Sequence, residues 1–182
     1  MRLFLAIVPD EEAIKSISKI QNKIKEVIVN RRIRFVPIDQ FHITLEFFAD
    51  SNPNKIIDLL KDVSFNEFEA ILDKIELIPN EKLTRVISLS SLPNSFSNKL
   101  NELKYNVEKL LGVEKENKNR SFLPHLTIVR VKRKITIDEI KRTKEIKLDK
   151  IKFRINSFTL YESRLSSEGA VYSKIHDFPA IH

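Results

Sequence analysis

The 182-residue sequence contains no cysteine and only two glycines, Gly112 and Gly169. The absence of cysteine excludes disulfide bonds, thiolate zinc sites and a cysteine nucleophile. Two glycines this far apart cannot form the glycine-rich loop that cradles phosphates in Rossmann and P-loop nucleotide-binding proteins. Both of these nucleotide-binding classes are therefore excluded.

Long apolar runs are missing as well. The apolar run between Arg2 and Pro9 has six residues, which is too short for the core of a signal peptide or for a membrane span. No other segment is long enough for either role. We therefore expect a cytoplasmic protein with no membrane-spanning segment, and the lack of cysteine is compatible with a reducing cytosol.

Positive charge is in moderate excess, with 32 Lys and Arg against 25 Asp and Glu and a net charge of +7. Such an excess favours attraction to a polyanion such as a nucleic acid, because it raises the local concentration of an oppositely charged partner. It is equally compatible with a protein whose charge only keeps it in solution. Hydrophobic residues make up 42% of the chain, which is enough for the core of one domain or of two closely joined lobes.

Helical and strand patterns are mixed along the chain. Asp10 is a candidate N-cap, and Thr136 with Glu139 forms a candidate capping box. The patterns predict helices at about 11–28, 55–63, 94–111 and from 136, a loop at 112–120, and strands at 2–8, 31–37, 41–48, 66–78, 84–90, 122–131, 151–163 and 170–178. We expect strands 66–78 and 84–90 to pair, and Gly169 to lie in the turn before the last strand. The fold class is therefore α+β with a largely antiparallel sheet.

Two of the predicted strands carry the same pair of polar residues. His42 and Thr44 stand in "HITL", and His125 and Thr127 stand in "HLTI" 83 residues later. Six of the 182 residues are threonine, so two such matches among three eligible histidines arise by chance roughly three times in a thousand. Because the separation is close to half the chain, we interpret the two segments as the product of a duplication that gave two lobes.

The spacing of two residues would put each histidine and its threonine on one face of a strand. Imidazole titrates at about pH 6.5, so one ring of a facing pair can be protonated while the other is neutral. Such a pair can take a proton from a nucleophile and give one to a leaving group, while threonine hydroxyls donate hydrogen bonds to phosphate oxygens. If the lobes face each other, the four side chains suit attack on a phosphodiester without a metal.

Other interpretations of the histidines remain. A lone histidine in an apolar strand is more often a core or edge residue that bonds a backbone group. Two histidines could also ligate zinc, although no third ligand is evident and threonine is a poor one. His176 and His182 lack the pattern, and we assign them to the surface and the tail.

Strict alternation makes further predictions about the two strands. It places Arg130 on the face opposite His125 and Thr127. Arg130 would then reach the groove only from the strand end, or pair with a carboxylate behind the sheet, so it is a secondary candidate. In the first strand alternation assigns the buried face to Phe41, Ile43, Leu45 and Phe47, and the polar face to His42, Thr44, Glu46 and Phe48.

The segments around these motifs resemble the two-histidine phosphoesterases, in the branch of RNA 2′,3′-cyclic phosphodiesterases, also called 2′-5′ RNA ligases. "RLFLAI" is similar to the opening strand of that family, "RFVPIDQFHITLEFF" and "RSFLPHLTIVR" to its two motif regions, and "FTLYESRLSSEGAVYSKIHDF" to its closing hairpin. The resemblance spans nearly the whole chain. Where the family often has glycine after the first motif, Ala49 and Asp50 stand here, which affects a turn and not the chemistry.

The resemblance implies a single bilobal domain over residues 1–182, with helices outside and the two motif strands facing a central cleft. It implies hydrolysis of a terminal 2′,3′-cyclic phosphate on RNA to a 2′-phosphate, without a metal or other cofactor. His42 would donate a proton to the departing 3′ oxygen, His125 would activate water, and Thr44 and Thr127 would hold the phosphate oxygens. Some members also join such an end to a 5′-hydroxyl. The partner would be RNA, such as a tRNA fragment, and the protein would act as a monomer.

Two other functions stay open at this stage. The cleft could bind RNA ends or nucleotides without turnover, although intact motifs argue against a decayed site. It could also act on a small cyclic phosphate that is not RNA, although the basic charge favours RNA. The residues with weaker claims to the groove are Phe4, Tyr161 and Ser163, which could equally be core, and Arg31, Arg32, Arg34, Lys132, Arg133 and Lys134, which could hold an RNA backbone or form a solvated rim.

Overall fold

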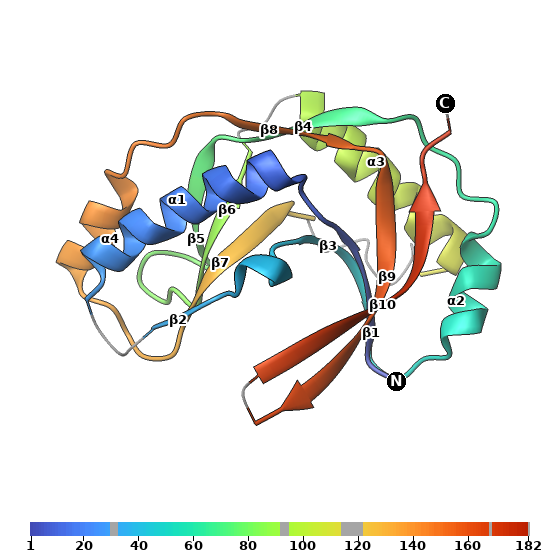
Figure 1. The fold of residues 1–182 in the computed structure, drawn as a ribbon, viewed down its shortest axis with the longest axis horizontal. Coiled ribbons are helices and arrows are strands. Elements are labelled where there is room, and N and C mark those ends of the chain that lie inside the picture. The colour runs from blue at the N-terminus through green and yellow to red at the C-terminus, as the bar shows by residue number, and fades with distance from the viewer. Residues whose placement is uncertain (30–32, 92–94, 114–121, 168, 182) are drawn as a thin grey trace.

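The computed structural model describes residues 1–29, 33–91, 95–113, 122–167 and 169–181. In these residues the chain forms four α-helices, one 3₁₀ helix and ten strands (Figure 1). In order they are β1 Leu3–Ile7, α1 Glu11–Val27, β2 Ile33–Phe35, η1 Ile38–Gln40, β3 Ile43–Phe48, α2 Pro53–Leu60, β4 Phe68–Leu72, β5 Lys74–Ile78, β6 Val86–Ser90, α3 Ser95–Leu111, β7 His125–Val131, α4 Ile137–Lys144, β8 Ile151–Ile155, β9 Ser157–Ser166 and β10 Gly169–Pro179. None of the described helices is both long and apolar enough to cross a membrane.

The strands form one large sheet and one small sheet. The eight-stranded sheet has the order β10-β9-β1-β3-β7-β6-β5, with β2 paired to β7, and β4 pairs with β8 separately. Every pair of named strands is antiparallel. Figure 1 shows α1 and α4 outside one half of the arched sheet, and α2 and α3 outside the other. The predicted α+β class with two lobes and external helices is confirmed.

Apart from β2, η1 and β10, the two halves of the chain repeat the same elements in the same order. The series β1, α1, β3, α2, β4, β5 is followed by β6, α3, β7, α4, β8, β9. The shift of 83 residues between the histidines also separates Leu3–Ile7 from Val86–Ser90 and Phe68–Leu72 from Ile151–Ile155. At the centre Ile43 of β3 pairs with Leu126 of β7, while β9 pairs with β1 and β5 with β6. Each half therefore contributes a strand to the other, which supports the duplication.

Two strands predicted as continuous are each divided in the structure. Residues 66–78 contain β4 and β5, and residues 151–163 contain β8 and the start of β9. At Asp73 and at Asn156 the chain leaves the small sheet and enters the large one. Neither break is marked by glycine or proline, so alternation alone could not reveal it, and the prediction of single strands was wrong. The predicted pairing with residues 84–90 is confirmed for β5 and β6.

The predicted helix starts are confirmed in two cases. The Asp10 carboxylate accepts a hydrogen bond from the Ala13 backbone N–H at 2.9 Å, and Thr136 with Glu139 forms the capping box of α4. Helix α2 begins at Pro53, two residues before its predicted start, because the Asn52 side chain caps it. Residue 94, the predicted start of α3, and residues 114–120 of the predicted loop lie outside the described residues.

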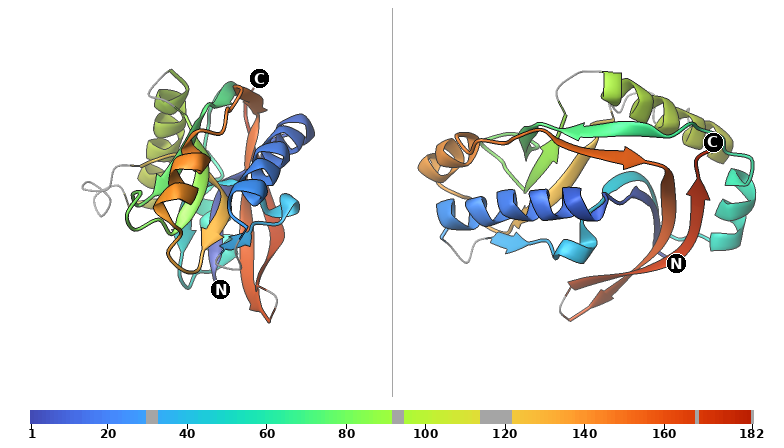
Figure 2. Two further views of the ribbon diagram at one scale, coloured as in Figure 1. Left: turned by 90° about the vertical axis from the view of Figure 1, so that its left-hand side faces the viewer. Right: turned by 45° about the horizontal axis from the view of Figure 1, so that its top comes forward.

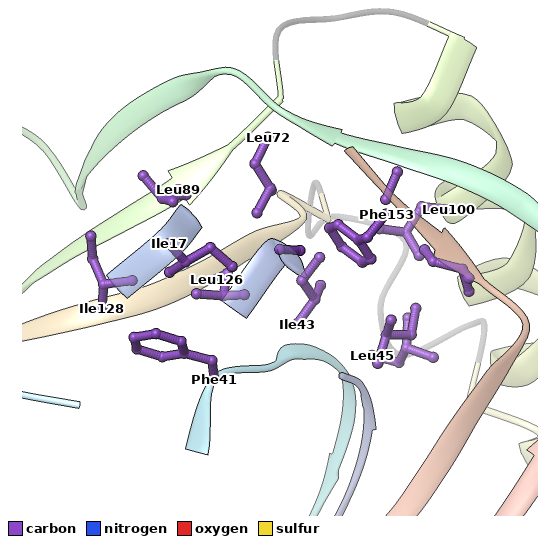
Figure 3. Packing of buried hydrophobic residues seen from close by; sticks show 14 of the residues in the cluster. Ile17, Phe41, Ile43, Leu45, Leu72, Leu89, Leu100, Leu126, Ile128 and Phe153 are labelled. Atoms are coloured by element: carbon purple, nitrogen blue, oxygen red, sulfur yellow. The ribbon is translucent and has the colours of Figure 1, made fainter. Parts of the chain in front are cut away.

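The core lies between the large sheet and the helices. Figure 3 shows Ile43 and Leu126 in the middle, with Ile17 and Ile128 to one side and Leu45 and Leu100 to the other. All six side chains are buried. The apolar side of each motif strand is thus anchored in the core. This fixes the positions of the side chains on the opposite side of the sheet. Figure 2 shows that the β9–β10 hairpin extends away from the helices.

Candidate active site

An open groove of about 490 Å³ lies on the side of the sheet opposite this core. Its volume is within the usual range of about 300–1,000 Å³ for small-molecule sites. The groove brings together all five residues that the sequence singled out, namely His42, Thr44, His125, Thr127 and Arg130.

The two motifs meet at the centre of the large sheet. His125 begins β7, whereas His42 lies one residue before β3, in the extended segment that follows η1. Because Ile43 pairs with Leu126 in antiparallel register, the next positions along the strands place His42 beside Thr127 and His125 beside Thr44. Each histidine therefore neighbours the threonine of the other motif, in a locally two-fold arrangement.

Both imidazole rings are oriented by the same hydrogen bond. Nδ1 of His42 lies 2.7 Å from the Gln40 carbonyl oxygen, and Nδ1 of His125 lies 2.8 Å from the Leu123 carbonyl oxygen. A carbonyl oxygen can only accept, so Nδ1 carries the proton in each ring. Nε2 of each histidine is thereby left for proton transfer, as a base when the ring is neutral and as an acid when it is charged.

His42 sits in an aromatic environment. Its ring centroid lies 5.1 Å from that of Phe4 and 5.5 Å from that of Tyr172. Burial lowers the pKa of His42 below its ordinary value of 6.5, the hydrogen bond to the Gln40 carbonyl opposes this, and the positive charges of Arg130 and His125 lower it further. In the unliganded groove the neutral form of His42 is therefore favoured.

A hydrogen bond from Ser88 on the neighbouring strand β6 orients the Thr127 hydroxyl. The Ser88 hydroxyl, which is fully buried, donates to Oγ1 of Thr127 at 3.4 Å. Since Thr127 accepts this bond, its own proton is available for a phosphate oxygen in the groove.

Arg130 lines the groove, which corrects the expectation from alternation. Thr127 and Val129 of β7 pair with the consecutive residues Ser88 and Ile87 of β6, so β7 carries one extra residue, Ile128. Such a bulge reverses the alternation beyond it, and bulges of this kind commonly redirect side chains beside active sites. Ile128 and Val129 are both buried, and Arg130 returns to the face of Thr127.

The first motif strand has the same bulge, and the predicted faces of Glu46 and Phe47 are exchanged. Thr44 and Glu46 pair with the consecutive residues Ala6 and Leu5 of β1. Phe47, assigned to the buried face by alternation, lines the groove and is 69% exposed. Glu46, assigned to the polar face, points away from the groove and pairs with Lys104. Phe47 and Arg130 occupy equivalent positions of the two halves, 83 residues apart.

The remaining candidates divide between the groove and other surroundings. Phe4 lines the groove although it is only 3% exposed, and Tyr161 stacks behind it at 5.3 Å between ring centroids. Ser163 lines the groove as well.

His176 packs its ring edge-on against Phe178 and does not reach the groove. Arg31, Arg32 and His182 lie outside the described residues, and Lys132, Arg133 and Lys134 do not line the groove.

Arg34 lines the groove beside Arg130, its direct partner in the β2–β7 register. A Cβ atom at Gly169 would come within 1.9 Å of Nη2 of Arg34, so only glycine allows this approach. Gly169 also has a φ of 134°, a value that favours glycine. The groove therefore has a cationic end at Arg34 and Arg130 and an aromatic end around His42.

Sequence reasoning missed the groove residues of β10 and of η1. Tyr172 and Ala170 come from β10, and the Gln40 side chain donates to the Ala170 carbonyl at 2.9 Å. No local pattern marks these residues, because only the folding of the hairpin across the groove brings them there. Within the described residues, no three of His, Cys, Asp and Glu gather as a metal-binding group.

Comparison with known proteins places this geometry in a family. The family model described as LigT-like phosphoesterase matches residues 7–88 and again residues 91–172, once for each half of the chain. The chain belongs to the LigT-like phosphoesterase family. It is therefore an enzyme of the phosphoesterase class, as the sequence predicted.

Members of this family resemble the chain over nearly its full length. The RNA 2′,3′-cyclic phosphodiesterase of Methanocaldococcus jannaschii is 32% identical, with 98% of this chain and 100% of the relative covered. The protein of that name from Methanothermobacter thermautotrophicus is 28% identical, with 98% of each covered. Among solved structures, TT0787 of Thermus thermophilus has a TM-score of 0.75 at 26% identity over all of both chains. The fold of E. coli LigT complexed with 3′-AMP is also similar, with a TM-score of 0.76 at 20% identity over 100% of this chain and 98% of that one.

Proposed function

We propose that the protein hydrolyses terminal 2′,3′-cyclic phosphates of RNA to 2′-phosphates, with His42 and His125 as acid and base. One observation carries the proposal. Both histidine–threonine pairs line one groove, and both rings are held by Nδ1 so that Nε2 is left for proton transfer. The names of the relatives from two archaea support RNA 2′,3′-cyclic phosphate as the substrate.

The proposed reaction is a single in-line displacement. Nε2 of His125 takes a proton from water, whose oxygen attacks phosphorus as the bond between phosphorus and the 3′ oxygen breaks. Nε2–H of His42 gives its proton to that 3′ oxygen, which leaves a 3′-hydroxyl and a 2′-phosphate. Thr44 and Thr127 donate to the non-bridging oxygens, and Arg130 offsets their negative charge. A 5′-hydroxyl of RNA in place of water would give 2′-5′ ligation with the same groups.

The asymmetry of the groove supports an RNA substrate. Arg34 and Arg130 at one end can hold a phosphate backbone, and the aromatic rings of Phe4, Phe47 and Tyr172 at the other end can contact a nucleoside. We further propose that residues 1–182 act as one bilobal domain, because each half contributes a strand to the other. Action as a cytoplasmic monomer stays a prediction.

The proposed function is tested on an RNA oligonucleotide and a mononucleotide, each with a 2′,3′-cyclic phosphate, in the presence of EDTA. We expect conversion to the 2′-phosphate at an undiminished rate, read by phosphorus NMR, with the oligonucleotide preferred. Loss of activity in EDTA would reject the metal-independent mechanism. Recovery of the bound cyclic end unchanged would indicate a binding module, and preference for the mononucleotide would indicate a small cyclic phosphate as the substrate.

The titration of His42 gives a second test. Because burial lowers its pKa, the ring should titrate below pH 6.5 in the free protein and lose its proton as the pH rises through that lower value. Bound phosphate should move the midpoint upward, because a neighbouring anion favours the imidazolium form. Histidine ring NMR shifts, followed against pH with and without inorganic phosphate, measure both effects. A midpoint above 6.5 in the free protein, or one unmoved by phosphate, would contradict the expectation.

A further inference from the structure

The two bulges occupy equivalent places in the two motif strands. The extra residue is Leu45 in β3 and Ile128 in β7, each one residue after a motif threonine. Both are buried, with exposures of 2% and 0%. Each bulge decides whether the following side chains face the groove or the core. Any residue that holds a bulge therefore also sets the geometry of the groove.

Gln21 of α1 holds the bulge in β7. Its side chain is 2% exposed, and Nε2 donates to the carbonyl oxygens of Ile128 at 2.8 Å and Val36 at 2.9 Å. The backbone N–H of Val36 donates to the same Ile128 oxygen at 3.0 Å. A buried glutamine whose two N–H groups both bond to the backbone is strongly constrained, since losing either bond leaves one of its own buried N–H groups unpaired.

Lys104 holds the other bulge from the equivalent position of α3, 83 residues after Gln21. It is 8% exposed, and Nζ lies 2.5 Å from Oε2 of Glu46 and 2.8 Å from Oε1 of Glu108. Glu46 directly follows the bulge residue, and its Oε1 accepts a hydrogen bond from the Phe47 backbone N–H at 3.0 Å. Lys104 thus fixes the carboxylate that fixes the backbone of Phe47.

In both cases the contact crosses from one half to the other. Helix α1 of the first half contacts β7, β8 and α4 of the second, and α3 of the second half contacts α2 and β4 of the first. We propose that Gln21 and Lys104 are a matched pair of positioning residues. Each reaches from the helix of one half to the bulge in the other half's motif strand, and so directs the groove residues that follow it.

The inference rests on the proposed function wherever activity is the readout. Gln21→Met keeps a similar volume but removes both N–H donors, and Asn22→Met makes the same change on the exposed side of the next residue. We expect Gln21→Met to lower kcat/KM roughly 10–100-fold by displacing Arg130, and Asn22→Met to stay within about twofold.

A double-mutant cycle separates positioning from general damage. If Gln21 acts through Arg130, adding Gln21→Met to Arg130→Ala should change kcat/KM by less than about threefold, because the group that it positions is already gone. Multiplied effects of the two substitutions would overturn the inference. So would a folded Gln21→Met protein with the kcat/KM of the wild type, or an equal loss in Asn22→Met.

Binding of inorganic phosphate tests the same inference without turnover. Gln21→Met should weaken phosphate binding and shift the backbone amide NMR signals of Val129 and Arg130, and wild-type values for both would overturn the inference. If the wild type does not hydrolyse cyclic phosphates, the proposed function fails while this measurement still decides the positioning role. If Gln21→Met does not fold, Lys104→Arg and Lys104→Met decide it through binding of a nucleoside 2′-phosphate, whose nucleoside the Phe47 ring would contact. Lys104→Arg should keep the wild-type affinity and Lys104→Met should weaken it, and equal values would overturn the inference.

Discussion

Replacing His42 or His125 by alanine should lower kcat/KM for a 2′,3′-cyclic phosphate by roughly 10²–10⁴-fold, because each ring transfers a proton in the same displacement. Replacing both should cost little more than replacing one, since groups that act as a unit lose their joint effect together. Steady-state kinetics of the two single variants and of the double variant measure this. Multiplied losses would show that the two rings act independently.

His176→Ala is the matched control for this experiment. His176 packs edge-on against Phe178 at 4.8 Å between ring centroids and does not line the groove. Its replacement should leave kcat/KM within about twofold of the wild type. Full activity in His42→Ala or His125→Ala, or an equal loss in His176→Ala, would refute the acid and base roles.

Phe41→Ala and Phe47→Ala should affect the protein in opposite ways. Phe41 is 1% exposed and packs in the core just before His42, so its truncation should lower the free energy of unfolding by about 3–5 kcal/mol. Phe47 is 69% exposed, so its truncation should change that free energy by only about 0.5 kcal/mol. The KM of Phe47→Ala should nevertheless rise, because the ring lines the groove.

Urea unfolding followed by circular dichroism measures the stability of both variants, and steady-state kinetics gives the KM. The two phenylalanines form a matched pair, since both stand at odd positions of the same segment and strict alternation gives them one role. Equal destabilisation by the two substitutions would mean that the bulge at Leu45 is absent in solution. The predicted face of Phe47 would then be right after all.

The groove could be predicted largely from the sequence because its main signal is local. A histidine and a threonine two residues apart share a face in any regular strand, and the repeated motif indicated two strands that meet. The apolar partners Ile43 and Leu126 were assigned correctly to the core for the same reason. Local periodicity and the repeat together gave the α+β class and the catalytic candidates.

The directions of Arg130, Glu46 and Phe47 could not be predicted, because a bulge depends on contacts from elsewhere in the fold. No glycine or proline stands beside Leu45 or Ile128, so the sequence does not mark the extra residue in either strand. What makes a bulge favourable is the tertiary hydrogen bonding of its backbone, which comes from α1 for β7 and, through Glu46, from α3 for β3. The breaks at Asp73 and Asn156 escaped prediction for a similar reason, since a change of sheet is decided by the partner strand.

The exchange of β5 and β9 between the halves has a consequence for the origin of the protein. A single ancestral half would have left strand edges unpaired, and two copies would have completed each other as a symmetric homodimer with the groove on the two-fold axis. Both ends of that groove would have been chemically identical. Fusion of two copies into one chain freed equivalent positions to diverge, as Phe47 and Arg130 have. A groove with one aromatic and one cationic end can bind an asymmetric ligand in a single orientation, which identical subunits could not achieve.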